Sequence, residues 1–506
     1  MEAGEMAAEI QGITLRGVEA LPVEIEAEIT SGMFSFSVVG LPDTAVRESR
    51  ERVRAALRGL DISIYGRIAV NLAPADLPKE GSLLDLPIAV ALAREKNYCA
   101  PDRPALYMGE LALDGRVRAV RGAVPAAILA RSLGLPLFCP AGNASEVALV
   151  EGVEAYSVET LLDMLLYLRQ EKPLPRVDRV NPPDIIGAAD PDFADVKGQA
   201  AARRALEICA AGHHNILLVG SPGSGKTMMA RALRGILPPL SDAEFLETLL
   251  IKSAVGLPLP SDRQRPFRQV HHTASAVSIC GGGNEMRPGE VSFAHRGVLF
   301  LDEFTEFRRD LTEALRQPLE DGFITINRAA GSVTYPSRVL LVLAANPCAC
   351  GWRGDPVEHC RCSSQELDRY RRKFSGPMLD RVDLYVSVPR LTPQELLELG
   401  GAAAESSETV RKRVIRARER QWERSELTGA RCNAELPEKV LKRSIGLSAD
   451  ARKYLSGMAE RLRLSGRGIT RVLRVSRTIA DLAGAEKIEA SAVAEAISFR
   501  DSGVLE

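Results

Sequence analysis

The feature that most constrains this chain is a glycine-rich segment between an expected strand and an expected helix. The apolar run 216–219 precedes the segment, and the helix-favouring run 228–233 follows it. In such a setting the glycines let backbone N–H groups turn inward around a phosphate, and the helix N-terminus adds partial positive charge. A plain glycine turn is the alternative. The pattern G-x-x-x-x-G-K-T favours a P-loop, made by Gly220, Ser221, Pro222, Gly223, Ser224, Gly225, Lys226 and Thr227.

A second apolar run, 297–301, ends in two acidic residues downstream of the P-loop. We expect Lys226 to reach the β and γ phosphates of ATP, and Thr227 to offer its hydroxyl to Mg²⁺. Asp302 would hold that Mg²⁺ through water, and Glu303 would polarise the water that attacks the γ-phosphate. An apolar run before two acids is also a common structural pattern. After a complete P-loop it predicts the catalytic strand of an ATPase.

The length and net charge of the chain only loosely limit its number of domains and its class of partner. A chain of 506 residues forms about three or four domains. Its 65 Lys and Arg residues nearly balance its 66 Asp and Glu residues, so any basic surface must be local. No run approaches the roughly 20 apolar residues of a membrane span, and the start of the chain is acidic where a signal peptide would be basic. We therefore expect a cytoplasmic protein without a membrane partner.

Composition also suggests where the domains end. Residues 1–170 alternate strand-like runs, such as 23–29, with helical ones, such as 44–57, whose arginines are typical of a solvated face. Prolines concentrate in 171–190, which predicts an exposed linker. We expect an ATPase core over 191–390 and a helical domain over 391–506.

Two closely spaced pairs of cysteines follow the core strands. Nine residues separate the pairs, so four thiols could close one tetrahedral site. Thiolates suit Zn²⁺, and His359 could replace one of them. Free thiols of a reducing compartment are the alternative. The residues concerned are Cys348, Cys350, Cys360 and Cys362.

Several of these segments resemble one known family. Segments 40–57 and 70–88 are similar to the N-terminal domain of the ComM/YifB group of magnesium-chelatase-like proteins, whose fold resembles the Lon protease domain. Segment 192–199 resembles the start of an AAA+ module, and the cysteine cluster matches this group as well, with Ala349 where we expect proline. The resemblance covers nearly the whole chain. It implies an α/β protein, with a Lon-like domain before an AAA+ P-loop core that has a parallel sheet and a helical lid.

A Lon-like domain raises the question of proteolysis by a Ser-Lys dyad. The aligned positions carry Leu83 and Val124, so both partners are missing. Ser82 is one place off and is typical of a turn or cap. We expect no protease activity.

The resemblance assigns further residues to ATP hydrolysis. Asn346 follows the apolar run 339–345, where AAA+ proteins place an asparagine that binds the attacking water or the γ-phosphate, although an asparagine before proline is also an ordinary turn. Arg381 would be the finger that a neighbouring subunit contributes. An ion pair with Asp380 or Asp383 is its alternative.

In the lid, the resemblance identifies Arg471 as the arginine that reaches the γ-phosphate, with Arg474 as the alternate. Structural ion pairs are possible for both. The basic helix expected over 409–424 fits either DNA contact or a solvated face.

Two segments are additions that a minimal AAA+ core would not need. They are a loop-rich insert over 266–290 and a hairpin over 322–338. This arrangement marks the magnesium-chelatase and MCM-helicase branch of AAA+ proteins, where such elements line the pore. Arg287 and Arg328 are therefore candidates for DNA phosphate contact, with solvated arginines as the alternative. His271 and His272 suggest a structural or nucleotide-sensing role rather than a metal site.

The expected function is an ATP-driven ring, a homo-hexamer, that uses ATP, Mg²⁺ and Zn²⁺ and acts on single-stranded or branched DNA. The family implies branch migration during natural transformation. Two alternatives stay open. A magnesium-chelatase-type motor would act with a partner carrying a D-x-S-x-S motif, which residues 61–65 fail to complete. A protein-remodelling chaperone would need an aromatic pore loop, and aromatic residues form only 5% of the chain.

Overall fold

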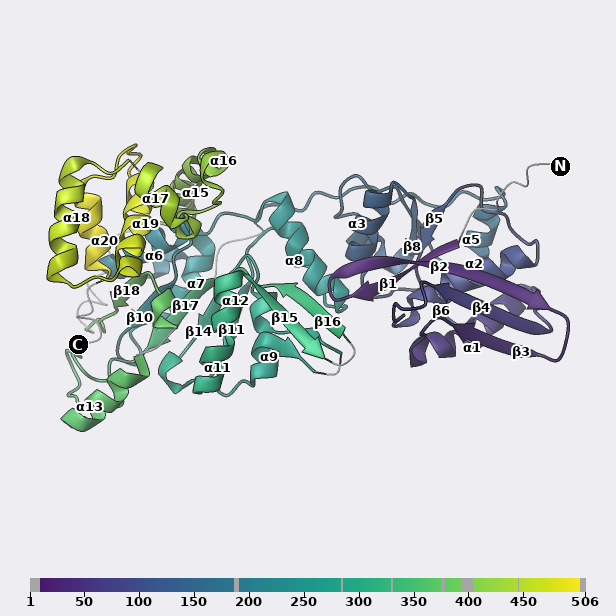
Figure 1. Cartoon of the computed structure of the whole chain (residues 1–506), viewed down its shortest axis with the longest axis horizontal. Coiled ribbons are helices and arrows are strands. Elements are labelled where there is room, and N and C mark those ends of the chain that lie inside the picture. Colours follow the sequence, from purple (N-terminus) through teal and green to yellow (C-terminus); the bar gives the residue numbers. More distant parts are fainter. Residues whose placement is uncertain are drawn as a thin grey trace. The chain divides into compact units, whose positions relative to one another are not determined.

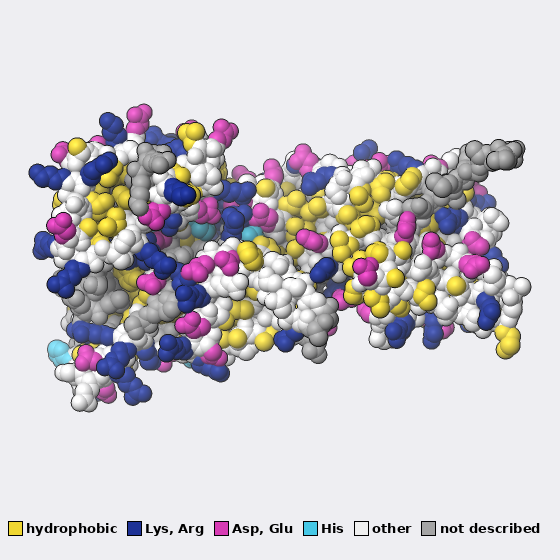
Figure 2. Space-filling view, in the orientation of Figure 1, with side chains coloured by type: hydrophobic (Ala, Val, Ile, Leu, Met, Phe, Trp, Pro, Cys, Tyr) yellow, Lys and Arg dark blue, Asp and Glu magenta, His cyan; other side chains and the backbone are white. Residues whose placement is uncertain are grey.

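The computed structural model describes residues 10–185, 191–283, 285–328, 331–374, 378–392, 404–444 and 446–500, with the side chains of 442–444 left out. The chain divides into two compact units (Figure 1). The first unit contains Met1–Pro183, Asp242–Asp262 and Asn327–Tyr335, and the second contains Asp184–Ser241, Arg263–Ile326 and Pro336–Glu506. Acidic and basic side chains are interspersed on the face in Figure 2.

A seven-stranded mixed sheet forms the centre of the first unit, in the order β3-β4-β2-β1-β5-β8-β9. In the second strand Val23 and Ile25 are buried between exposed neighbours, as expected for a half-buried strand. Bounds are β1 (Ile10–Arg16), β2 (Glu19–Thr30), β3 (Ser35–Val39), β4 (Arg67–Ala73), β5 (Ala105–Tyr107), β8 (Leu137–Pro140) and β9 (Ala155–Val158). A small pair, β6 (Glu110–Leu111) and β7 (Val117–Arg118), lies outside this sheet.

The helices of the first unit bury apolar faces around the sheet. Helix α1 (Thr44–Arg58) begins at Asp43, whose carboxylate accepts a hydrogen bond from the Val46 N–H at 2.7 Å. Helix α2 (Asp85–Glu95) is buried over nearly all its length, and α1 packs on it. The remaining helices are α3 (Ala123–Leu133), α4 (Ala144–Val147) and α5 (Leu161–Leu168).

A helix from the middle of the chain completes the first unit. Helix α8 (Asp242–Ala254) packs against α3. The Ser253 carbonyl accepts from Gly122 N–H at 2.7 Å, its hydroxyl oxygen accepts from Val124 N–H at 3.1 Å, and that hydroxyl donates to Glu146 at 3.0 Å. No sequence pattern predicts this pairing, which joins residues far apart in the chain.

The first part of the proline-rich segment runs along the first unit. Pro175 O accepts a hydrogen bond from Ser157 N–H, and Val177 N–H donates to Ala155 O, both over 2.9 Å. Residues 175–177 therefore extend the edge beside β9. The expected linker over 171–190 stays a prediction, and its residues 186–190 lie outside the described part.

A five-stranded parallel sheet forms the centre of the second unit, in the order β11-β14-β17-β10-β18. Three of its strands are the apolar runs that the sequence identified. Their residues are buried on both faces, as is usual for strands covered by helices on either side. Bounds are β10 (Ile216–Val219), β11 (Phe267–Val270), β14 (Val298–Leu301), β17 (Leu340–Ala345) and β18 (Leu384–Ser387).

Helices pack around this sheet, and a C-terminal group of helices packs on them. Helix α15 packs on α6 and α7, and α19 packs on α6, α15 and α20. Among the described residues, no helix is long and apolar enough to cross a membrane. Bounds are α6 (Ala200–Gly212), α7 (Lys226–Ile236), α13 (Ser364–Arg371), α15 (Ser407–Glu423), α17 (Glu438–Ser444), α18 (Ala449–Arg461), α19 (Gly466–Leu482) and α20 (Ala490–Ser498).

The basic helix α15 uses three of its arginines inside the second unit. Arg411 donates to Gly235 O, Arg418 donates to Ala210 O, and Arg413 pairs with Glu207 at 2.6 Å. These side chains fasten the lid to the core. These three arginines therefore have structural partners in the core and fit neither of the two roles expected from the sequence, DNA contact or a purely solvated face.

Both expected additions to the core are present. The hairpin consists of β15 (Phe323–Arg328) and β16 (Gly331–Pro336), and the insert contains α9 (Ala276–Cys280), β12 (Gly281–Gly282) and β13 (Arg287–Pro288). They touch, because a β-carbon on Gly281 would stand 3.0 Å from Ile326 Cδ1. The α/β fold class, with a parallel-sheet core followed by helices, is confirmed.

Candidate nucleotide site

The glycine-rich segment forms the turn from β10 into α7, as the sequence predicts. Gly223 and Gly225 have φ of +77° and +90°, a region that favours glycine. Lys226 begins the helix and its amine donates to Gly220 O at 2.7 Å and Ser221 O at 2.9 Å. Burial lowers the pKa of Lys226 to about 8. A phosphate entering this turn would replace the carbonyl partners of the amine.

The carboxylate strand places its acids beside the P-loop. Thr227 donates to Asp302 at 3.1 Å, which leaves the hydroxyl and the carboxylate side by side as Mg²⁺ ligands. Glu303 follows in the left-handed region with φ of +50°, a conformation that L-residues rarely adopt and that is typical of functional sites. Its carboxylate lies 3.2 Å from His272 Nδ1, without the alignment of a hydrogen bond.

Asn346 completes the group because β17 lies between β14 and β10 in the sheet. Its side-chain oxygen accepts from the Lys226 amine at 3.4 Å, and its backbone oxygen accepts from Tyr370 at 2.9 Å. The carboxyl ends of three parallel strands thus meet around a cavity of about 400 Å³. That cavity is lined by Pro222, Gly223, Ser224, Gly225, Lys226, Thr227, Met228, Asp302, Glu303, Ala345 and Asn346.

The two arginines assigned by resemblance lie elsewhere. Arg381 and Arg471 line a second cavity, of about 730 Å³, together with residues that precede β10, β17 and β18. Since all strands run parallel, this cavity is at the amino edge of the sheet, opposite the P-loop edge. Neither arginine therefore belongs to the cavity that holds Lys226.

Each of these arginines has an acidic partner in its own chain. Arg381, whose side chain is 11% exposed, pairs with Glu320 rather than with either aspartate considered from the sequence. Arg471 lies 3.7 Å from Asp383, and burial lowers its pKa. Arg474 donates twice to Leu436 O, at 3.0 and 2.6 Å, so its guanidinium is held by the backbone. The two lid candidates therefore differ. Arg474 is hydrogen-bonded to the backbone, whereas Arg471 forms an ion pair with Asp383 in this cavity.

A buried polar chain holds Asp383 in place. His214 lies between Asp383, at 3.3 Å, and the Thr478 hydroxyl, at 2.7 Å. Asn433 donates to Thr478 at 3.0 Å. These residues show no common motif in the sequence, because His214 precedes β10, Asp383 precedes β18, and the other two come from the C-terminal helical part.

The four cysteines gather in the loop after Asn346. Their sulfur atoms are separated by 3.4 Å between Cys348 and Cys350, and by 3.7 Å from each of these to Cys360. Cys362 belongs to the same group, within 4.8 Å. Four thiolates around Zn²⁺ at roughly 2.3 Å would lie roughly 3.8 Å apart, so the spacing fits a zinc ion. The exposed His359 is not in this group.

The dyad positions of the Lon-like domain are apolar. Leu83 is 1% exposed and Val124 is 0% exposed, so both belong to the core. Ser82 donates to Glu110, while the fully buried amine of Lys79 donates to Pro74 O. Ser82 and Lys79 therefore bind different partners rather than each other. The sequence did not predict that Lys79 is buried.

The two candidate arginines of the hairpins are at the surface. Arg287 pairs with Glu285 at 2.6 Å and its side chain is 62% exposed. Arg328 is exposed at the end of β15. Because both side chains are exposed, they could contact a phosphate backbone, but their positions fit solvated arginines equally well.

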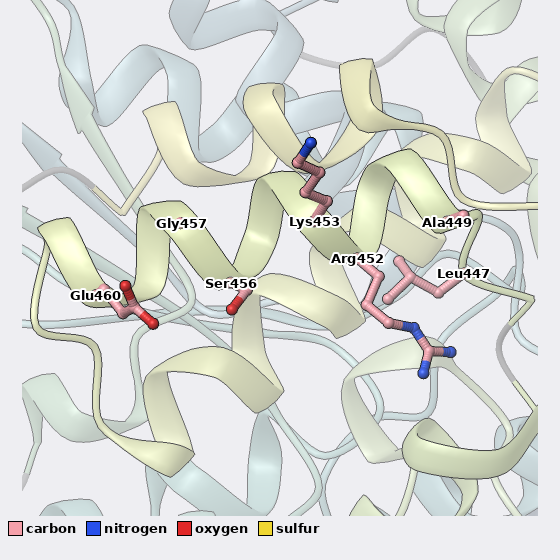
Figure 3. Close-up of a pocket in the computed structure, with 7 residues that line it drawn as sticks. All are labelled: Leu447, Ala449, Arg452, Lys453, Ser456, Gly457 and Glu460. Atoms are coloured by element: carbon pink, nitrogen blue, oxygen red, sulfur yellow. The ribbon is translucent and has the colours of Figure 1, made fainter.

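A further hollow, of about 610 Å³, lies along α18. Arg452 and Glu460 project from one side of the helix, whereas Lys453 points away from them (Figure 3). Because these charged groups do not converge, the hollow has no catalytic arrangement.

Comparison with known proteins shows similarity to one family over nearly the whole chain. Three family models match: magnesium chelatase subunit ChlI over 192–396, subunit ChlI of Mg-chelatase over 25–143, and the ChlI C-terminal model over 404–500. Competence protein ComM of Haemophilus influenzae is 42% identical over 96% of this chain and 95% of its own length. YifB of Escherichia coli, an uncharacterized protein, is 41% identical over the same shares. The magnesium-chelatase 67 kDa subunit of Heliobacterium mobile is 28% identical over 38% of this chain and 35% of its own.

Proposed function

The chain belongs to the ComM/YifB group of the magnesium-chelatase ChlI family of AAA+ ATPases, and from this membership we propose that it is an ATP-hydrolysing ring motor that acts on DNA. The resemblance inferred from the sequence is thereby confirmed. The proposed substrate is single-stranded or branched DNA, and the proposed activity is branch migration during natural transformation. The name of the Haemophilus relative, a competence protein, supports this choice. A cytoplasmic location follows, where DNA and ATP are both available.

The observation that carries ATP hydrolysis is the single cavity shared by five polar side chains. In this proposal Lys226 binds the β and γ phosphates, and Thr227 and Asp302 hold Mg²⁺. Glu303 polarises the attacking water, and Asn346 orients that water or the γ-phosphate. The short contacts among these residues support the assignment.

Ring formation is supported by the opposite placement of the two cavities. Arg381 and Arg471 line the amino edge of the sheet, while the P-loop lies at the carboxyl edge. In this proposal Arg381 and Arg471 therefore neutralise charge on the phosphoryl group of a neighbouring copy rather than of their own. Head-to-tail contacts of this kind close into a ring. We propose a homo-hexamer in which Arg381 and Arg471 serve the adjacent nucleotide.

The cysteine cluster is proposed to bind structural Zn²⁺. Cys348, Cys350, Cys360 and Cys362 supply four thiolates, a closed ligand set that leaves no position for a substrate. Such an ion would hold the loop that follows Asn346. It would have no direct part in ATP hydrolysis.

The first test compares ATP turnover without DNA and with single-stranded, duplex and four-way-junction DNA. The Glu303→Gln variant is the blank, since it keeps the binding pocket while it removes the group that polarises water. We expect DNA to stimulate turnover, and the stimulation to weaken with salt because backbone contacts release counterions. Intact hydrolysis without a response to any DNA would favour a protein-remodelling or magnesium-chelatase-type motor.

A further inference from the structure

Helix α1 in the first unit presents a continuous row of arginines to solvent. Its buried face consists of Val46, Ser49, Val53, Ala56 and Leu57. The adjoining face carries Arg47, Arg50, Arg54 and Arg58, all exposed. At 100° per residue these four lie within roughly 80° of the helix circumference and extend over about 16 Å. We call this row the arginine face.

Most of the arginine face is not neutralised by the chain itself. Arg50 lies 3.5 Å from Glu51, at the margin of the row. Among the described residues, no carboxylate lies within ion-pair distance of Arg47, Arg54 or Arg58. Spacings of four residues place like charges side by side, which weakens a helix rather than stabilising it. Ion pairs within the described chain therefore stabilise little of the row, and most of its positive charge is available to a partner.

Exposed rings border the arginine face. Phe34 is 46% exposed, and the Arg54 guanidinium lies 4.3 Å from the centre of its ring. Tyr65 is 75% exposed. Both precede neighbouring strands at one end of the sheet, because β3 and β4 run parallel and Ser35 N–H donates to Gly66 O at 3.2 Å. The fully exposed Met33, at 91%, adjoins Phe34.

Figure 2 shows Lys and Arg side chains along the margin of the first unit where α1 and β3 lie. Strand β3 is an edge strand of the seven-stranded sheet, so no neighbouring strand covers this end. Positive charge and exposed rings therefore occupy one accessible surface.

We propose that this surface, Arg47, Arg50, Arg54 and Arg58 with Phe34 and Tyr65, binds single-stranded DNA. The arginines contact successive phosphates, and the two rings stack on unpaired bases. Stacking selects a single strand, because paired bases in a duplex do not expose their faces. The inference rests on the proposed function, and it assigns to the Lon-like domain the task of holding the displaced strand.

The test measures binding of the full chain to a fluorescein-labelled 30-nucleotide thymidine strand, and to a duplex of equal length, by anisotropy over a range of salt concentrations. The first variant combines Arg47→Ala, Arg54→Ala and Arg58→Ala. Its matched control combines Arg103→Ala, Arg169→Ala and Arg179→Ala. Two of these control arginines pair with Glu154 and Glu151 near β9, at the other edge of the sheet. The thermal unfolding midpoint of each variant reports whether it folds.

Loss of three phosphate contacts lowers the slope of log affinity against log salt by about 2 and weakens binding roughly a hundredfold at 0.1 M salt. The control changes binding less than about twofold. Tyr65→Ala weakens binding to the strand roughly tenfold with an unchanged salt slope, because stacking carries no net charge.

Equal affinities of the arginine variant and its control would overturn the proposed surface while the proposed function stands. An equal loss for duplex and strand would overturn the choice of a single strand. If the unaltered chain binds no DNA even at low salt, the surface and the proposed DNA motor both fail.

Discussion

Gly351 of the cysteine loop lies against Pro222 of the P-loop: a β-carbon on Gly351 would stand 2.9 Å from Pro222 Cδ. Gly351 directly follows Cys350 and has φ of +85°. The contact joins two segments 129 positions apart. The cysteine loop thus packs against the turn that lines the candidate nucleotide site, at a point that has no room for a side chain.

This contact makes Gly351→Ala a sharp probe of the loop. The variant should weaken nucleotide binding roughly tenfold, since the methyl group must displace Pro222 and with it the phosphate-binding turn. Gly354→Ala is the matched control. Gly354 is in the same loop with φ of +75°, and nothing lies within 4 Å of its β-carbon. Both variants carry the backbone cost of a positive φ, so equal affinities for a fluorescent nucleotide would refute the contact argument.

Metal removal should act on the nucleotide site through the same loop. The loop begins at Asn346 and returns to it, since Tyr370 at the end of α13 donates to Asn346 O at 2.9 Å. With Zn²⁺ stripped, or in Cys360→Ser, we expect nucleotide affinity to fall about tenfold. Coupling between two sites is reciprocal. Bound nucleotide should therefore raise the affinity for Zn²⁺, measured by equilibrium competition with a chromophoric chelator, by a similar factor.

Cys280→Ser is the control for this prediction, because Cys280 is a partly exposed cysteine outside the cluster. Elemental analysis gives the metal content of each variant. Less than one zinc per chain, or an affinity for Zn²⁺ that nucleotide does not change, would contradict the coupling.

The sequence was sufficient to predict which polar side chains share the cavity at the carboxyl edge of the sheet. Strand periodicity identified β10, β14 and β17, and parallel strands bring their carboxyl ends to one edge, so Lys226, Glu303 and Asn346 were expected together. The position of Arg381 required the sheet order, which no local pattern encodes. No local pattern predicted its ion-pair partner, Glu320, either.

Basic helices show a second limit of sequence reading. The helix at 409–424 and the helix at 44–57 both carry many arginines, and their composition is alike. In the first, Arg411 and Arg418 bind backbone carbonyls of the core. In the second, Arg47 and Arg58 face solvent. Periodicity cannot separate these cases, because a long arginine side chain can reach a distant carbonyl.

Mixing two inactive variants tests the proposed use of arginine between subunits. Lys226→Ala loses its own nucleotide site but keeps Arg381, while Arg381→Ala keeps the nucleotide site and loses the finger. Alone, each should turn over ATP at least a hundredfold more slowly than the unaltered chain. In a random equal mixture about a quarter of the interfaces combine an intact site with an intact finger. Turnover should recover toward that fraction, whereas a finger acting within its own chain would give no recovery.

Asp383 provides a prediction about pH. Burial alone would raise the pKa of this carboxyl, but the hydrogen bond from His214 and the charges of His214 and Arg471 together lower it. A carboxylate with a depressed folded-state pKa contributes stability above its unfolded value, about 3.9, and loses that contribution as pH falls through the folded value. Asp383→Asn removes the charge and leaves Arg471 without its partner. The free energy of unfolding should therefore fall by about 2 kcal/mol at neutral pH.

That difference between the unaltered chain and Asp383→Asn should stay constant from about pH 7 to 9, where the carboxylate is fully ionised, and shrink only as pH falls below about 4. Denaturant titrations at several pH values measure it. Asp380→Asn is the control, because Asp380 lines the same cavity but is exposed, and surface charges contribute little to stability. A loss that grows on acidification, or one that Asp380→Asn reproduces, would show that the buried contact of Asp383 with His214 does not stabilise the junction of core and lid.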